Sequence, residues 1–198
     1  MSSHLVPILL SLVALGTAKV PGADDILVAD FEGKDYGEWK TTGEAFGPGP
    51  AQGTLSGQMA VDGYLGKGLV NSFYKGDGTT GTLTSPPFKL QRPHLKFLIG
   101  GGAFEGKTCM NLLVKGKVVR TATGPNTQPG GSEHLDWAGW DVSELAGQEA
   151  VIEIVDAATG GWGHINVDQI VQTDRKVAGL IKDATRAIAL EKRYLNRR

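Results

Sequence analysis

Short apolar runs separated by glycine, proline and small polar residues fill the chain from residue 26 to residue 173. In several runs apolar and polar residues alternate, which is the pattern of a strand with one buried face. The pattern predicts strands over Ile26–Phe31, Lys67–Phe73, Gly81–Leu90, His94–Gly100, Asn111–Val114, Lys117–Ala122, Ala150–Ala157 and His164–Thr173. Because no segment with helical periodicity separates these runs, we predict an all-β domain over residues 24–173, folded as a jelly-roll-like β-sandwich.

The N-terminal residues have a different pattern. An apolar run from Leu5 to Leu15 is too short to span a bilayer, and the small residues Gly16-Thr17-Ala18 follow it. Residues 1–23 are therefore predicted to be a signal peptide, although no Lys or Arg precedes the run. This predicts bacterial export to a secreted or periplasmic location, and a stray hydrophobic N-terminus is the alternative.

The C-terminal residues 174–198 combine apolar positions at near-helical spacing with many basic side chains. We predict a basic amphipathic helix that packs on a neighbour or acts as a linker to a catalytic region missing from this chain. A helix on a membrane surface is the alternative, but the apolar face is small and rich in alanine.

Charge and cysteine content exclude several classes of partner. The sequence has 20 Lys and Arg against 21 Asp and Glu, so no strong field would attract nucleic acid or an anionic membrane. The 29 glycines fit a domain rich in turns. One cysteine, Cys109, allows neither an intrachain disulfide nor a cysteine-based zinc site. Nothing indicates a coiled coil or a membrane span, and we expect a monomer.

The stretch NLLVKGKVVR predicts a hairpin with a two-residue turn at Lys115-Gly116. In that register Asn111 lies opposite Arg120, and both side chains point to the same face because side chains alternate along a strand. The hairpin would hold the two as a rigid pair of donors for a ligand. An exposed cross-strand pair without a function is the alternative.

The stretch TGGWGHINVDQI places aromatic and polar residues among glycines. Trp162 could stack on the apolar side of a sugar ring while His164 and nearby polar groups bind its hydroxyls. The alternative is a buried tryptophan that fills the end of the sandwich.

Asp168 lies in a predicted strand among apolar neighbours, which is an unusual place for a carboxylate. It could bind a structural Ca²⁺ together with an early acid such as Glu32 or Asp30, because calcium prefers oxygen ligands. No other cofactor is expected.

Seven segments together resemble the family 66 carbohydrate-binding modules: EAFGPGPAQGTL, GKGLVNSF, GTLTSPPF, FLIGGG, LLVKGKVVRTATG, LDWAGWDVSELAGQEAVIEIVD and TGGWGHINVDQI. The resemblance covers roughly Ile26 to Thr173. It implies a β-sandwich that binds the terminal fructose of fructans, levan in particular and inulin as a second candidate. Modules of that family are attached to glycoside hydrolase family 32 enzymes such as levanases and exo-inulinases.

The resemblance also implies a set of ligand-binding residues. The pocket of that family surrounds one fructose with acidic residues and an arginine. Arg120 in VVRTATG, Asp77 in GDGTTGTLTSP and Glu105 after GGG match those positions. Further motif members complete the predicted set: Asn71, Ser72, Trp162 and His164.

The catalytic motifs of the associated hydrolases are absent from this sequence. No NDPNG, RDP or EC motif occurs. We therefore predict a module without catalysis of its own, which targets a fused or adjacent fructan hydrolase to polysaccharide. Two alternatives remain: a small glycan hydrolase that uses two of its own carboxylates, and a structural or adhesion β-sandwich of a truncated family 32 hydrolase.

Overall fold

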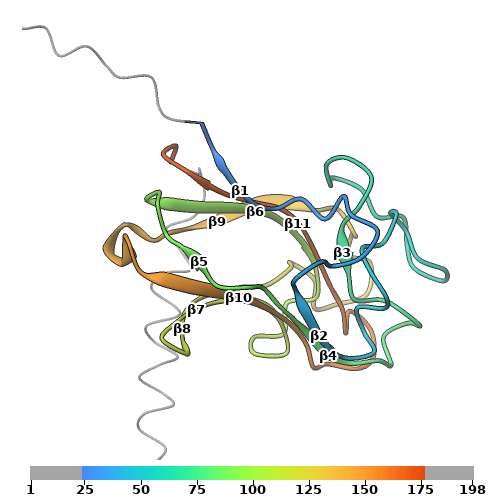
Figure 1. Cartoon of the computed structure of the whole chain (residues 1–198). Helices are drawn as coiled ribbons and strands as arrows, with labels where there is room; N and C mark the ends of the chain where they lie inside the picture. The colour runs from blue at the N-terminus through green and yellow to red at the C-terminus, as the bar shows by residue number, and fades with distance from the viewer. Residues whose placement is uncertain (1–23, 177–198) are drawn as a thin grey trace, which may run out of the picture.

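The computed structural model describes residues 24–176, and nearly all of its regular structure is β. The strands form two antiparallel sheets that lie one above the other (Figure 1). The elements are β1 (Ile26–Ala29), β2 (Lys40–Gly43), β3 (Val70–Asn71), β4 (Gly81–Thr84), β5 (Phe88–Lys89), β6 (His94–Gly101), β7 (Thr108–Val114), β8 (Lys117–Ala122), β9 (Asp136–Asp141), the 3-10 helix η1 (Ser143–Leu145), β10 (Glu149–Asp156) and β11 (Ile165–Thr173).

Strands distant in sequence are neighbours in both sheets. One sheet has the order β1-β11-β6-β9, with β3 also paired to β11. The other has the order β2-β4-β10-β7-β8, with β5 also paired to β10. This arrangement confirms the predicted all-β class with facing sheets.

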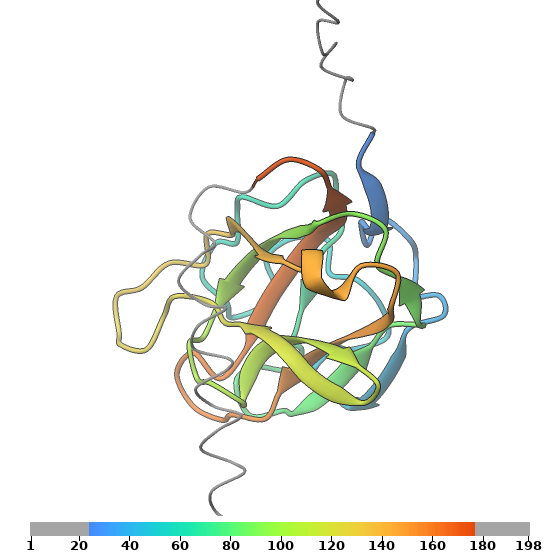
Figure 2. The ribbon, with the colours of Figure 1, turned by 90° about the vertical axis from the view of Figure 1, so that its left-hand side faces the viewer.

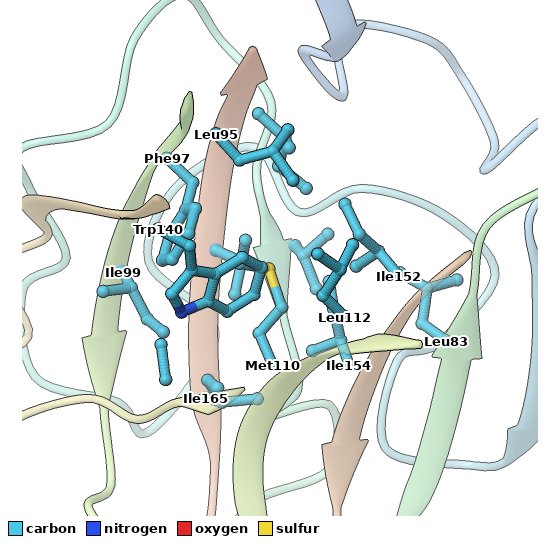
Figure 3. Packing of buried hydrophobic residues seen from close by; sticks show 14 of the residues in the cluster. Leu83, Leu95, Phe97, Ile99, Met110, Leu112, Trp140, Ile152, Ile154 and Ile165 are labelled. Carbon is cyan, nitrogen blue, oxygen red and sulfur yellow. The ribbon is translucent and has the colours of Figure 1, made fainter. Parts of the chain in front are cut away.

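The main hydrophobic core lies between the two sheets (Figure 3). Alternation along β10 buries Ile152 and Ile154, while alternation along β6 buries Leu95, Phe97 and Ile99. Trp140 of β9 packs on Phe97, with ring centroids 4.7 Å apart. Burial of this apolar surface is the main favourable contribution to folding, and it leaves the loops at the sheet ends available for a site.

The two ends of the sandwich differ. Figure 2 views the molecule from the end that carries η1 (Ser143–Leu145). The opposite end carries β3 and the long loops around it (Figure 1). Within residues 24–176 no helix is long and apolar enough to cross a membrane.

Two strands, β2 and β9, were not predicted from the sequence. β2 is exposed along its whole length and has no apolar residue, whereas β9 is interrupted by Gly139 and begins and ends with aspartate. The predicted signal peptide at residues 1–23 lies outside the described residues. Most of the predicted C-terminal helix does too, and its first three residues, 174–176, are not helical.

The predicted hairpin forms, but its register changes part-way along. Lys115 and Gly116 have φ of 52° and 74°, as the predicted turn requires, and Leu113 pairs with Val118. An irregularity between Leu112 and Leu113 then shifts the pairing by one residue.

Beyond that shift Asn111 pairs with Thr121, while Arg120 pairs with Leu112. The prediction that Asn111 and Arg120 lie opposite each other is therefore wrong. A single irregularity in the ladder moves every later side chain to the other face.

Candidate functional site

A pocket lies among the loops at the end of the sandwich that carries β3. Its volume is about 250 Å³, just below the roughly 300–1,000 Å³ of pockets for drug-sized ligands. Its walls come from residues 57–59, from Phe73 and Asp77, from the loop of residues 129–133, and from Trp162 and His164. A cavity of this size suits a ligand of about one ring.

His164 is the centre of a buried polar network in this pocket. Its Nδ1 lies 2.6 Å from Asp77 Oδ1, and its Nε2 lies 3.0 Å from both carboxylate oxygens of Glu133. Asn166 Nδ2 donates to Glu133 Oε2 at 2.8 Å. His164 and Asn166 share one side of the chain because they are two residues apart as β11 begins.

The network favours the charged form of His164. Burial alone would lower the pKa of His164, but the contacts with Glu133 and Asp77 outweigh burial and raise it. Each ring nitrogen faces a carboxylate, and only an imidazolium has a proton to donate from both nitrogens. The ring thus bridges two acids as a cation.

A third acid, Asp156 at the end of β10, lies next to this network. Burial raises the pKa of Asp156 to about 7, because nearby Ser72 and the charge of His164 offset the loss of water only in part. Neither carboxyl oxygen of Asp156 has a hydrogen bond of normal geometry. Below neutral pH the neutral acid is therefore the main form in this buried position.

Trp162 forms a wall of the pocket with a left-handed backbone, φ 63°. Its side chain is largely buried, at 8% exposure, and its Nε1 donates to the carbonyl of Gln128 at 2.9 Å. The ring lies 5.8 Å from the His164 ring, and the Phe73 ring meets His164 edge-on at 5.0 Å. Trp162 thus lines the pocket and is not an open stacking platform.

Asn71 lies behind the pocket wall. It is 1% exposed, and its Nδ2 donates to Gln58 Oε1 at 2.7 Å. Gln58 lines the pocket, next to Met59, which is 52% exposed. Asn71 therefore positions a neighbour that reaches the cavity. Ser72 lies alongside, where its backbone N–H donates to the carbonyl of Ile165.

The structure places three predicted ligand residues elsewhere. The Arg120 guanidinium donates to the backbone carbonyl of Asp141 at 2.8 and 3.1 Å and pairs with Glu144 in η1. Asn111 is buried in the middle of β7, and Glu105 is exposed in the turn before that strand. None of these three lines the pocket.

The structure brings Glu32 and Asp168, the two predicted calcium ligands, near each other. Glu32 Oε1 accepts hydrogen bonds from the backbone N–H of Lys67 and Gly68, at 2.7 and 2.9 Å. Asp168 Oδ2 accepts one from Leu65 at 2.8 Å, whereas its buried Oδ1 has no partner.

Burial raises the pKa of Asp168 to about 6, and the charges of Glu32 and Asp30 add to this effect. The unpartnered Oδ1 and this crowding of acids fit one side of a calcium site. In the part of the chain that the structure describes, however, no three His, Cys, Asp or Glu side chains converge to hold a metal. Calcium takes about 6–8 oxygen ligands, so carbonyls and waters would have to supply the rest.

Several pocket residues were not predicted from the sequence. Glu133 and Gln58 lie in loops with many polar residues, and nothing in their spacing separates them from other loop residues. Phe73 follows β3 and carries no polar group. Only the folded chain brings these positions to His164.

One curated relative is similar to most of this chain. "Putative glycosyl hydrolase ecdE" of Aspergillus rugulosus is 47% identical over 161 residues, which is 80% of this chain and 22% of the relative. The name of this relative contradicts the prediction that the chain is not an enzyme. The chain spans less than a quarter of the relative's length, so the activity of the whole relative applies to this chain only as a proposal.

Solved structures give weaker matches. One is a cyclase from Fischerella sp. TAU, with 14% identity over 76% of this chain and 96% of that chain and a TM-score of 0.48. Another is a family 35 carbohydrate-binding module from Clostridium thermocellum, with 15% identity over 75% of this chain and 97% of that chain and a TM-score of 0.37. A third is the K2 cleaved adhesin domain of Lys-gingipain, with 18% identity over 76% of this chain and 99% of that chain and a TM-score of 0.43. These likenesses are too low to carry an argument. No family model matches the chain, so membership of family 66 stays a prediction.

Proposed function

We propose that this chain is the glycan-recognition part of a glycosyl hydrolase and that the pocket around His164 receives one sugar unit at a chain end. The observation that carries this proposal is the buried His164, which links two carboxylates that both line the cavity. Carboxylates accept hydrogen bonds from sugar hydroxyls, and bonds to a charged group are stronger than neutral ones. The glycosyl hydrolase relative supports the same reading.

The composition of the pocket favours an uncharged sugar. Among the described residues, its lining contains Asp77, Glu133 and His164 but no Lys or Arg. An anionic sugar would meet two carboxylates and a single cation, whereas a neutral sugar offers hydroxyl donors. The resemblance to family 66 supports the terminal fructose of levan-type fructans, with inulin as a second candidate.

A small polar ligand buries little apolar area, so we expect weak affinity for one site. Attachment to a hydrolase that meets many chain ends would raise the overall affinity through multivalency. The function that follows is to hold a fructan end close to the hydrolytic site.

A second candidate is hydrolysis in this same pocket. It rests on Asp77 and Glu133, which contact opposite nitrogens of one imidazole ring. Glycoside hydrolysis uses a pair of carboxyl groups, and these two acids line the same cavity. The alternative of a small hydrolase thus has a specific pair of acids to test.

Calorimetric titration of the full chain with levan, inulin and free fructose tests the proposal. Asp77→Asn should lower the affinity about tenfold or more, because a charge-assisted hydrogen bond contributes about 1.5–3 kcal/mol. Glu105→Gln is the matched control, since Glu105 lies outside the pocket, and it should bind as wild type. Absence of binding to any fructan by wild type would exclude this ligand.

A reducing-sugar assay on the same fructans tests the second candidate. Sustained release of fructose, lost in both Asp77→Asn and Glu133→Gln, would establish catalysis in the pocket. Release that survives both changes would place catalysis elsewhere.

Other parts of the proposal rest mainly on the sequence. We infer export to a secreted or periplasmic location, a monomeric state, a jelly-roll-like connection of the strands and a structural Ca²⁺ at Glu32 and Asp168. Calcium there would neutralise the crowded acids and satisfy the unpartnered Asp168 Oδ1.

A further inference from the structure

We propose that His164 is a positioning residue for sugar binding: its imidazolium, held between Asp77 and Glu133, fixes the Asp77 carboxylate where it can accept a hydroxyl of the bound sugar. This inference rests on the proposed function. It goes further because it states that the charge of one buried side chain, His164, holds the sugar-binding carboxylate in place. Sugar binding then depends on whether the His164 ring is protonated.

In this network, His164 joins two loops of the pocket, the loop that carries Asp77 and the loop that carries Glu133. Asp77 follows β3 and Glu133 precedes β9, yet both reach the same ring, at 2.6 and 3.0 Å. The His164 side chain is 3% exposed, so water cannot replace either contact easily. The rings of Phe73 and Trp162 pack beside the imidazole, with ring centroids 5.0 and 5.8 Å from its own.

The two carboxylates are not equivalent. Glu133 is 3% exposed and keeps a second donor, Asn166 Nδ2, at 2.8 Å. The Asp77 side chain is 25% exposed and can turn towards water. A neutral imidazole has one N–H to donate. An unpaired carboxylate costs more free energy at the buried Glu133 than at Asp77, which water can reach, so the N–H should stay with Glu133. Loss of the proton would therefore release Asp77, the carboxylate nearest to solvent.

The charged groups that face His164 come from three elements: Asp77 after β3, Glu133 before β9 and Asp156 at the end of β10. Asp77 and Glu133 both stabilise the imidazolium. Asp156 would add a third negative charge once it ionises, which would hold the imidazolium proton more tightly. The network thus contains two groups that can lose a proton, Asp156 and His164. A substitution of Asp156 separates the effect of its proton on sugar binding from the effect of the His164 proton.

The test is titration of levan, or of the fructan that wild type binds best, between pH 5.5 and 9 with the full chain. We expect wild-type affinity to fall about tenfold or more towards the alkaline end while circular dichroism still shows a folded domain. His164→Gln, which has no charge, should bind about tenfold more weakly at pH 6 and show no pH dependence. Asp156→Asn should keep the alkaline fall and move it to lower pH.

Nitrogen-15 NMR of the His164 ring adds a readout that a merely structural role would not move. Both ring nitrogens should be protonated at neutral pH, and their titration should follow the loss of affinity. A flat pH profile of wild type, wild-type affinity in His164→Gln, or loss of the alkaline fall in Asp156→Asn would each overturn this inference while the proposed function stands. No binding by wild type at any pH would overturn both.

Discussion

His164 Nδ1 lies 2.6 Å from Asp77 Oδ1, although 87 residues separate the two along the chain. This contact joins the start of β11 to the segment after β3, and the second ring nitrogen extends the link to Glu133. His164 therefore contributes both to the pocket and to the packing of the fold. Substitutions at other positions should separate effects on sugar binding from effects on stability.

Arg120→Ala should destabilise the domain and leave sugar affinity unchanged. The guanidinium satisfies the carbonyl of Asp141 and pairs with Glu144, so its removal leaves a carbonyl unpaired, at a cost of about 1–3 kcal/mol. Urea unfolding would measure the loss, and calorimetry with levan would measure affinity. A folded variant that has lost fructan binding would instead support the ligand role predicted from the family resemblance.

Gly131→Ala should disturb the pocket through Trp162. A Cβ at Gly131 would lie 2.1 Å from Asn126 Oδ1 and 2.7 Å from Trp162 Cζ2, so both side chains would have to move. We expect a shift in tryptophan fluorescence and weaker sugar binding. Gly78→Ala is the matched control, because a Cβ there meets nothing within 4 Å. Equal affinity of both variants and wild type would show that the Trp162 wall does not contribute to binding.

Stability should fall as pH rises from about 4 to 7. Burial raises the pKa values of Asp156 and Asp168 to about 7 and about 6, against 3.8 in the unfolded chain, so the folded state binds more protons across this window. His164, whose pKa is also raised, adds a loss of stability at still higher pH. Urea unfolding at pH 5 and pH 7.5 should differ by a few kcal/mol, since each pKa unit is about 1.36 kcal/mol.

The reverse trend, with stability rising from pH 5 to 7.5, would show that these acids are ionised in the folded state. Asp156→Asn is an internal control, because it should flatten the part of the profile near pH 7 without adding a charge.

Calcium should raise the midpoint of thermal unfolding at neutral pH. A cation at Glu32 and Asp168 would favour the ionised form of Asp168 and occupy its unpartnered Oδ1, and any ligand of the folded state stabilises it. The comparison is a melting curve in calcium against one in chelator. Asp168→Asn should lose the calcium effect, and equal midpoints for wild type in both conditions would contradict the proposed ion.

The sequence determined most of the β framework. Alternating apolar positions mark β10, which buries every second side chain, whereas short apolar runs mark β6 and β11, which are buried on both faces. β2 gave no such signal, since it buries no side chain. The sequence also singled out Asp77, Trp162 and His164, because aromatic and ionisable residues lie there among glycines, and the structure places all three in the lining of the candidate pocket.

Tertiary structure decided which residues share the site. Glu133 and Gln58 join His164 only through loop closure, which a local pattern does not encode. The irregularity in the ladder of β7 and β8 separated Asn111 from Arg120, because one extra residue reverses the facing of those that follow. Arg120 is a strong hydrogen-bond donor in any context, and only its place beside Asp141 and η1 shows that it stabilises the opposite end of the sandwich. The sequence supplied the chemistry of the groups, and folding decided which of them meet.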